Sequence, residues 1–240
     1  MTPAGRSERL EELRQNLAAV EERIGAACAA ADRVRSDVTL VVVTKTYPAS
    51  DVSLLAELGV TDVGENRHPE AGEKAADVAA PLRWHFMGGL QTNKAGAVAR
   101  YADVVHSVDR AKLVASLERG AVAADRDLEV LLQVDLGPDF DRPSDGRSGA
   151  APTDLAALAD AVAGTQRLRL GGVMTVAPLG VDPAPVFERL ASLAQQLRAD
   201  HPGATSISAG MSGDLEAAVA AGATHLRVGR AILGERPSLG

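Results

Sequence analysis

Lys45 directly follows a run of apolar and β-branched residues, and this position could make its amine unusually reactive. The run at 38–44 is typical of a buried strand, so the lysine would leave that strand at its carboxyl end. Burial disfavours the charged ammonium and lowers the pKa of a lysine, which leaves a neutral amine that attacks carbonyl groups. The alternative is a lysine whose amine extends into solvent from the strand end.

A second chemical signal is the segment Ser-Ala-Gly-Met-Ser-Gly-Asp at 208–214. It is typical of a strand, a turn of small residues and a helix capped by Ser212 or Asp214. Backbone N–H groups at such a helix start bind phosphate, and hydroxyl groups add donors. Gly229, just after the last predicted strand, would allow another close backbone approach. An ordinary capped turn is the alternative interpretation.

A lysine amine and a phosphate site together indicate two classes of ligand. One is pyridoxal 5'-phosphate (PLP), and the other is a sugar phosphate in a Schiff-base aldolase. Arg227 favours PLP, because a guanidinium cannot give up its proton and would donate to an unprotonated pyridine nitrogen. The alternative role for Arg227 is a structural ion pair with a carboxylate such as Glu65 or Asp214.

The histidines and the cysteine indicate packing rather than metal chemistry. His85, His106 and His225 lie in or beside predicted strands, and their spacing matches no metal motif. Cys28 is the only cysteine, which excludes an intramolecular disulfide and a cysteine-rich zinc site. Its alanine neighbours in the first predicted helix favour an inert, packed thiol.

An alternation of helices and strands positions these residues. A first helix over 7–30 carries apolar residues at spacings of three and four. Strands are expected at 38–44, 61–64, 83–86, 104–107, 128–136, 170–176, 206–208 and 225–228. Helices between them are expected at 51–58, 69–80, 94–100, 110–124, 153–164, 183–200 and 214–221.

This order predicts an α/β fold, a single (β/α)8 TIM barrel with an extra N-terminal helix. Alternating strands and helices demand parallel strands with right-handed crossovers, and eight such units fit a closed barrel. Residues 1–240 would form one domain, with chemistry at the carboxyl ends of the strands. The polar segment 137–152 interrupts the pattern and is expected to be a disordered surface loop, with a lid or partner-contacting loop as the alternative.

Composition narrows the function classes. Lys and Arg number 25 against 32 Asp and Glu, and the net charge of −7 argues against a nucleic-acid partner. Aromatic residues are 2%, so Ala, Val and Leu must build the core. The sequence holds no apolar run long enough to span a membrane, and its N-terminal segment is charged rather than signal-like. A cytoplasmic protein without a membrane partner is expected.

Several motifs together resemble the YggS/PROSC family of PLP homeostasis proteins. The motifs are LVVVTKT at 40–46, GEN at 64–66, WHFMG at 84–88, LQTNK at 90–94, SAGMSGDLEAA at 208–218 and LRVGRAILG at 226–234. The resemblance covers essentially the whole chain in the right order, so chance agreement is excluded.

The resemblance implies a barrel like the N-terminal domain of bacterial alanine racemase, of fold type III. It implies PLP held as an internal aldimine on Lys45, with Arg227 facing the pyridine nitrogen and Asn66 near the ring. It implies phosphate contacts from Ser208, Gly210, Met211 and Ser212, with Gly229 nearby. It also implies a protein without robust turnover that buffers PLP or delivers it to PLP-dependent apoenzymes.

Three residues depart from the pattern of that family. Arg67 stands where the family usually has Tyr or a similar residue, Gly89 replaces a usual Pro, and Arg230 stands where Thr is frequent. The two arginines would add positive charge at the barrel mouth. The loop at 137–149 is also longer than the resemblance leads one to expect.

Three functions are compatible with these residues. A PLP carrier is favoured over a PLP-dependent racemase or decarboxylase. A two-base racemase needs a second acid or base, normally a tyrosine from an added domain, and the tyrosines here are Tyr47 and Tyr101. Without a second domain to complete a site, a monomer is expected. The sugar-phosphate aldolase is disfavoured by Arg227.

Overall fold

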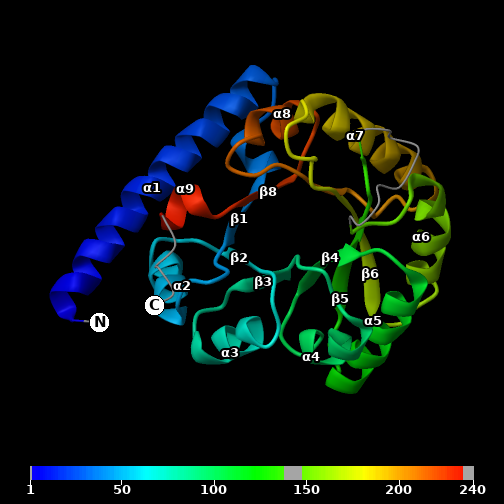
Figure 1. Ribbon diagram of the computed structural model, residues 1–240, viewed down its shortest axis with the longest axis horizontal. Helices are drawn as coiled ribbons and strands as arrows, with labels where there is room; N and C mark the ends of the chain where they lie inside the picture. The colour runs from blue at the N-terminus through cyan, green and yellow to red at the C-terminus, as the bar shows by residue number, and fades with distance from the viewer. Residues whose placement is uncertain (1, 138–147, 235–240) are drawn as a thin grey trace.

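The computed structural model describes residues 2–137 and 148–234, which form a closed barrel of parallel strands surrounded by helices (Figure 1). Each strand pairs with the next along the chain, and the last closes on the first. The strands are β1 (Thr39–Val43), β2 (Asp62–Glu65), β3 (Arg83–Phe86), β4 (Val104–Val108), β5 (Leu128–Gln133), β6 (Leu168–Met174), β7 (Ser206–Ser208) and β8 (His225–Val228). The predicted (β/α)8 barrel is confirmed.

Helices follow the strands in alternation and cover the outside of the barrel. They are α1 (Pro3–Ala30), α2 (Ala49–Glu57), α3 (Glu70–Asp77), α4 (Ala95–Val98), α5 (Ala111–Ala124), α6 (Leu155–Ala163), α7 (Pro183–Asp200), α8 (Leu215–Ala220) and α9 (Arg230–Leu233). Short 3-10 helices lie at Arg35–Asp37, Thr92–Lys94 and Pro152–Asp154. Helix α9 was not predicted, because a four-residue helix is too short to show periodicity.

The layer between barrel and helices is the main hydrophobic core. It is built largely from buried Val, Leu and Ala side chains, as the low aromatic content requires. Strands β2, β4, β5 and β8 are buried at every residue, since one face packs on helices and the other faces the barrel interior.

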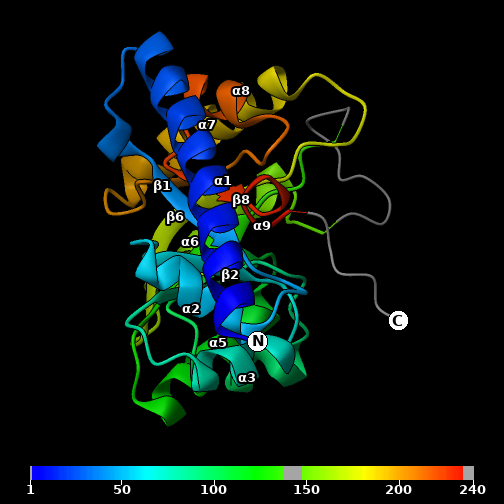
Figure 2. The ribbon, with the colours of Figure 1, turned by 90° about the vertical axis from the view of Figure 1, so that its left-hand side faces the viewer.

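Helix α1 begins four residues before the predicted start at 7. Thr2 accepts a hydrogen bond from the N–H of Gly5 (3.3 Å), and Pro3 occupies the first helical turn, where its missing N–H costs nothing. The helix packs against α8, α9 and α2, and Figure 2 shows it lying across this flank of the barrel. The extra N-terminal helix therefore covers a flank of the barrel.

Strand β6 lies two residues earlier than the predicted 170–176. Its pairing with β5 starts at Leu168, and the register shifts beside Gly172, which has a φ of 150°. A Cβ at Gly172 would overlap the backbone carbonyl of Ser206. Gly171 and Gly172 therefore mark a bulge inside the strand rather than its beginning.

Most of the predicted loop at 137–152 lies outside the described residues, so its role stays untested. Its last part returns to the barrel. Val134 and Ala150 form an isolated parallel bridge, and the N–H of Ala150 donates to the carbonyl of Gln133 (2.8 Å). Strand β5 consequently ends at Gln133, three residues before the predicted end.

We predict that Gly172→Ala destabilises the barrel by about 3 kcal/mol, because the new methyl group meets backbone at a φ that L-residues avoid. For a chain of this size, that loss corresponds to a fall in Tm of about 6–12 °C. Thermal unfolding followed by circular dichroism measures it. Gly203→Ala is the matched control, because nothing lies within 4 Å of its added Cβ. Equal Tm values for the two variants would contradict the bulge.

Candidate functional site

A cavity of about 460 Å³ lies at the carboxyl ends of the strands, within the size range of small-molecule sites. It gathers six of the residues predicted for the site, namely Lys45, Asn66, Met211, Ser212, Arg227 and Gly229. The further lining residues are Val43, Tyr47, Met87, Gly88, Met174, Val176, Gly213 and Arg230. The structure therefore brings together side chains that are up to 187 positions apart in the sequence.

Lys45 lies on the turn that follows β1, with its side chain partly buried at the cavity wall. Thr46 adopts a left-handed conformation with a φ of 71°, which is uncommon for a β-branched residue. The backbone N–H of Thr46 donates to Oε1 of Glu70 (2.8 Å). The carbonyl of Thr44 accepts from Nζ of Lys74 (2.8 Å). Both backbone neighbours of Lys45 are thus bound by α3.

Lys74 is the centre of this contact between α3 and the Lys45 turn. Its Nζ also donates to Oε1 of Glu65 and of Glu70, each at 2.8 Å, and its side chain is only 8% exposed. Burial raises the pKa of Glu65 in spite of this pairing. The pKa of Glu70 is lowered, because the Lys74 and Thr46 hydrogen bonds outweigh the opposing effect of burial. We call Thr44, Thr46, Glu65, Glu70 and Lys74 the outer clamp.

Asn66 follows β2 and lines the cavity, and one of its polar atoms, Oδ1, is buried without a hydrogen-bond partner among the described residues. Gly88 lies against the Asn66 backbone, where any Cβ would overlap the Asn66 carbonyl. An unpaired buried oxygen is costly, so a ligand donor near Asn66 would find an acceptor already desolvated.

The turn at 208–214 contributes Met211, Ser212 and Gly213 to the cavity. The N–H of Met211 donates to Oδ1 of Asp214 (2.5 Å), so this carboxylate closes the turn. Asp214 is the N-cap residue of α8, as one of the two predicted alternatives has it, and its side chain makes no cap hydrogen bond. The carbonyl of Ser212 accepts from Arg23 of α1 at 3.1 and 3.2 Å.

Ser208 and Gly210 do not line the cavity, although both were predicted there. The Ser208 hydroxyl is fully buried inside the barrel, within 2.7 Å of Arg227 and 2.9 Å of His106. Gly210 has a φ of 88° and packs so closely that a Cβ would lie 2.6 Å from the Ala218 methyl group. Both residues therefore lie behind the turn and support its position rather than facing the cavity.

Arg227 is buried at the floor of the cavity and donates to neutral partners. Its Nη1 donates to Oγ of Ser208 (2.7 Å) and its Nη2 to the carbonyl of Thr175 (2.8 Å). Burial lowers its pKa to about 10, so it stays positively charged near neutral pH. The alternative ion pair with Glu65 is wrong, since that carboxylate pairs with Lys74.

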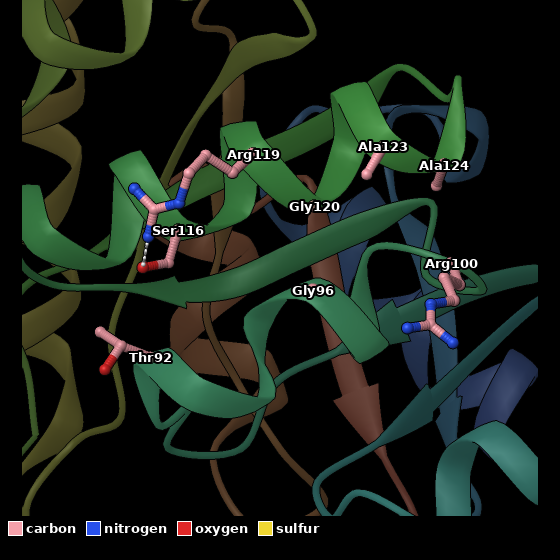
Figure 3. Close-up of a pocket in the computed structure, with 8 residues that line it drawn as sticks. All are labelled: Thr92, Gly96, Arg100, Ser116, Arg119, Gly120, Ala123 and Ala124. Carbon is pink, nitrogen blue, oxygen red and sulfur yellow. Dashed lines mark hydrogen bonds between the residues drawn. The ribbon is translucent and has the colours of Figure 1, made fainter.

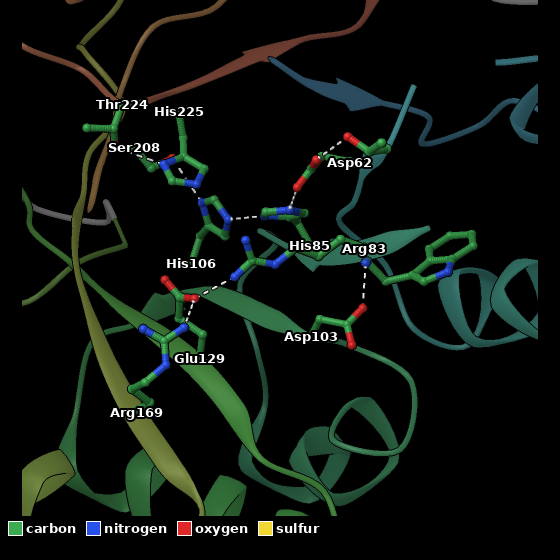
Figure 4. A network of polar contacts seen from close by, with 12 residues as sticks. Asp62, Arg83, His85, Asp103, His106, Glu129, Arg169, Ser208, Thr224 and His225 are labelled. Atoms are coloured by element: carbon green, nitrogen blue, oxygen red, sulfur yellow. Dashed lines mark hydrogen bonds and ion pairs between the residues drawn. The ribbon is translucent and has the colours of Figure 1, made fainter. Parts of the chain in front are cut away.

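The three strand histidines form one cluster inside the barrel beneath the cavity (Figure 4). Ring centroids are 5.1 Å apart for His85 and His106, and His225 lies 6.1 and 6.3 Å from them. They bond to protein groups, as expected for core histidines: Asp62, Ser208 and Thr224. Among the described residues, no cluster of His, Cys, Asp or Glu is arranged to hold a metal ion.

Residues that sequence reasoning missed are mostly apolar members of the lining. Met87 and Met174 gave no chemical signal, but the alternation of inward and outward residues along β3 and β6 could have found them. Of the two tyrosines, Tyr47 lines the cavity and its hydroxyl donates to the carbonyl of Gly234 (2.7 Å). Tyr101 lies outside the cavity and stacks on His68 in the helical layer.

A second hollow of similar size, about 490 Å³, lies between α4 and α5 (Figure 3). Gly96 and Gly120 let these helices approach closely, and Arg119 donates to the Ser116 hydroxyl (2.9 Å). This hollow contains none of the predicted site residues and lies on the outer layer. The barrel-mouth cavity is therefore the candidate site.

Among the described residues, no helix combines the length and apolar character that crossing a bilayer requires.

Comparison with known proteins points to one family. Residues 9–237 match the family model described as alanine racemase, N-terminal domain. A protein of Mycobacterium tuberculosis named pyridoxal phosphate homeostasis protein is 41% identical over 246 residues, covering 95% of each chain.

Solved structures give the same result for the fold. PipY of Synechococcus elongatus, solved with PLP bound, has a TM-score of 0.80 and 32% identity, covering 92% of this chain and all of PipY. An alanine racemase of Clostridium difficile has a TM-score of 0.73 at 15% identity, over 95% of this chain and 58% of that enzyme. The racemase shows a shared fold alone.

We predict that Lys74→Met lowers the free energy of unfolding by about 3–5 kcal/mol, because it leaves buried acceptors of the outer clamp unpaired. Denaturant unfolding measures the loss. Lys112→Met, at an exposed position of α5, is the matched control and should change stability by less than about 0.5 kcal/mol. A Lys74 variant as stable as this control would show that the clamp contributes little.

From the histidine cluster, we predict that the free energy of unfolding falls as pH drops from 6.5 toward 4. Burial, and then the neighbouring His85, lower the pKa of His225 to about 4, so it binds a proton near pH 6 only after unfolding. The contribution of neutral, buried His225 to stability is fully present above pH 6.5 and is lost as pH falls through about 4. His225→Asn should reduce the fall between pH 6.5 and 4.5 by about 2 kcal/mol, measured by urea unfolding. An unchanged slope would contradict this assignment.

Proposed function

Because the chain belongs to the family of pyridoxal phosphate homeostasis proteins, we propose that it binds PLP in the barrel-mouth cavity and takes part in PLP homeostasis. The observation that carries the proposal is the convergence of a lysine amine, a donor-only guanidinium and a glycine-lined turn on one cavity. PipY, with the same fold and PLP bound, supports it.

The residues at the cavity fit the chemistry of PLP. Asn66 offers a buried acceptor without a partner, and Arg227 offers a buried donor toward a ring nitrogen. Gly229 allows a ligand to approach the backbone closely. A Cβ at this position would lie 3.0 Å from the carbonyl oxygen of Val43 and would narrow the cavity. Each end of the ligand would therefore meet a group of suitable chemistry.

Bound PLP supplies an aldehyde carbon that a primary amine can attack reversibly. Lys45 provides that amine from a turn held by the outer clamp, so little backbone conformational entropy remains to be lost there. Arg227 stays protonated at neutral pH. Its N–H group would donate a hydrogen bond to the ring nitrogen, which would then act as the acceptor. This arrangement weakens the ring as an electron sink and suits storage better than turnover.

For the phosphate end, we propose the Ser212 hydroxyl and the backbone of Ser212 and Gly229 as the contacts, with Met211 lining the cavity while its N–H stays bound to Asp214. Arg230, a departure from the family pattern, lines the same cavity and would add a positive charge. Arg67 and Gly89 lie outside the lining residues. We assign Gly210 the role of shaping this turn. We assign Ser208 the role of supporting Arg227 from inside the barrel.

The tyrosines support a role without robust turnover. Tyr47 is the tyrosine of the cavity, and its hydroxyl is already bonded to the Gly234 carbonyl, which makes it a poor second acid or base. We accordingly propose a single-domain, monomeric PLP carrier in the cytoplasm, with PLP-dependent apoenzymes as recipients. A PLP-dependent racemase or decarboxylase is the competing function.

The test of the attachment site is reduction with borohydride followed by peptide mass mapping. The chain contains four lysines, Lys45, Lys74, Lys94 and Lys112, so the assignment is a choice among four. A phosphopyridoxyl group is expected on Lys45, and Lys45→Ala should lose the visible absorbance of bound PLP. A label found reproducibly on Lys94 or Lys112, both exposed, would reject the proposed site.

A further inference from the structure

A continuous chain of hydrogen bonds runs from the cavity floor to the opposite end of the barrel. Arg227 Nη1 lies 2.7 Å from Ser208 Oγ, and Ser208 Oγ lies 2.9 Å from His106 Nδ1. His106 Nε2 then lies 2.8 Å from His85 Nδ1, and His85 Nε2 lies 2.8 Å from Asp62 Oδ1. Figure 4 shows the part from Ser208 to Asp62. Strands β8, β7, β4, β3 and β2 each contribute one group.

With both histidines neutral, all bonds of this chain run in one direction. Arg227 can only donate, and ionised Asp62 can only accept. Asp62 then accepts from His85 Nε2, His85 Nδ1 accepts from His106 Nε2, and His106 Nδ1 accepts from the Ser208 hydroxyl. Burial lowers the pKa of His106 well below its ordinary value, in agreement with a neutral His106.

The positive and negative charges of the chain lie at its two ends. Arg227 is 5% exposed and Asp62 9%, while the three groups between them are essentially inaccessible to water. Asp62 is itself held, because its second oxygen accepts from the Thr61 hydroxyl (2.7 Å). The guanidinium thus has no adjacent carboxylate along this chain, and its orientation depends on Ser208 and on the Thr175 carbonyl.

We propose that Ser208, His106, His85 and Asp62 are positioning residues that hold the Arg227 guanidinium, charged and oriented, toward the ring nitrogen of the bound ligand. This inference rests on the proposed function, because it assumes PLP in the cavity. Two of the five N–H groups of Arg227 are used by Ser208 and Thr175, which aligns the planar fork and leaves the other donors for a ligand. Neighbouring dipoles aligned in one direction strengthen one another.

The experiment compares the binding of PLP with that of its 1-deaza analogue, in which a C–H replaces the ring nitrogen. Ser208→Ala should weaken PLP binding about tenfold, because Arg227 loses the partner that orients it. The same variant should bind the deaza analogue as tightly as the wild-type protein does, within twofold. The visible spectrum of bound PLP should also shift in Ser208→Ala, whereas a merely structural defect would lower occupancy without moving the band.

His225→Asn is the matched control, because His225 lies in the same cluster but bonds to Thr224 outside the chain. It should leave the PLP spectrum and both affinities unchanged. Asp62→Asn provides a second test if Ser208→Ala folds poorly. It keeps the shape of the chain's far end, removes its charge, and should shift the spectrum in the same direction.

Equal losses of PLP and deaza-analogue affinity in Ser208→Ala, with an unmoved spectrum, would overturn the positioning chain while leaving the proposed function intact. Failure of the wild-type protein to bind either ligand would overturn the proposed function itself, and the chain with it. A spectral shift in His225→Asn as large as that in Ser208→Ala would also reject the chain, because proximity to the cluster would then suffice.

Discussion

Polar groups inside a closed barrel must satisfy one another, because water does not reach them, and this constraint organises the molecule. A buried donor or acceptor left unpaired costs about 1–3 kcal/mol, and an unpaired charge costs more. The interior here holds several charged or polar side chains from different strands, among them Asp62, His85, His106, Ser208 and Arg227. They are compatible with folding because each finds a partner in a neighbouring strand.

The same constraint shapes the cavity at the barrel mouth. At the amino-terminal ends of the strands, Glu129 binds Arg83 and Arg169, and the histidine cluster lies above these groups. Both layers consist of side chains committed to protein partners. Toward the carboxyl ends, Met87 and Met174 replace them, and these side chains line a cavity. The ligand space begins where the polar interior network ends.

The sequence was sufficient for the barrel and for the side chains at strand ends, but not for the direction in which each side chain points. Lys45, Arg227 and Ser212 were predicted because amine, guanidinium and hydroxyl groups carry chemistry and lie at or just beyond the carboxyl ends of strands. Ser208 was predicted for the same reason, yet the pleat turns its hydroxyl inward to Arg227. The outer clamp was not predicted, because Lys74 reads in the sequence as an ordinary helix lysine and its burial arises only on packing.

The cavity is consequently held from both sides of the sheet. On the outside, α3 binds the backbone on either side of Lys45 through Glu70 and Lys74. On the inside, the hydrogen-bonded chain fixes the guanidinium of Arg227. Strands β1 and β8 are neighbours, with Val41 opposite Arg227 and Val42 opposite Val228, so the two supports act on adjacent strands. An amine and a cation fixed independently, on strands whose register the barrel sets, keep a constant relation to any ligand that bridges them.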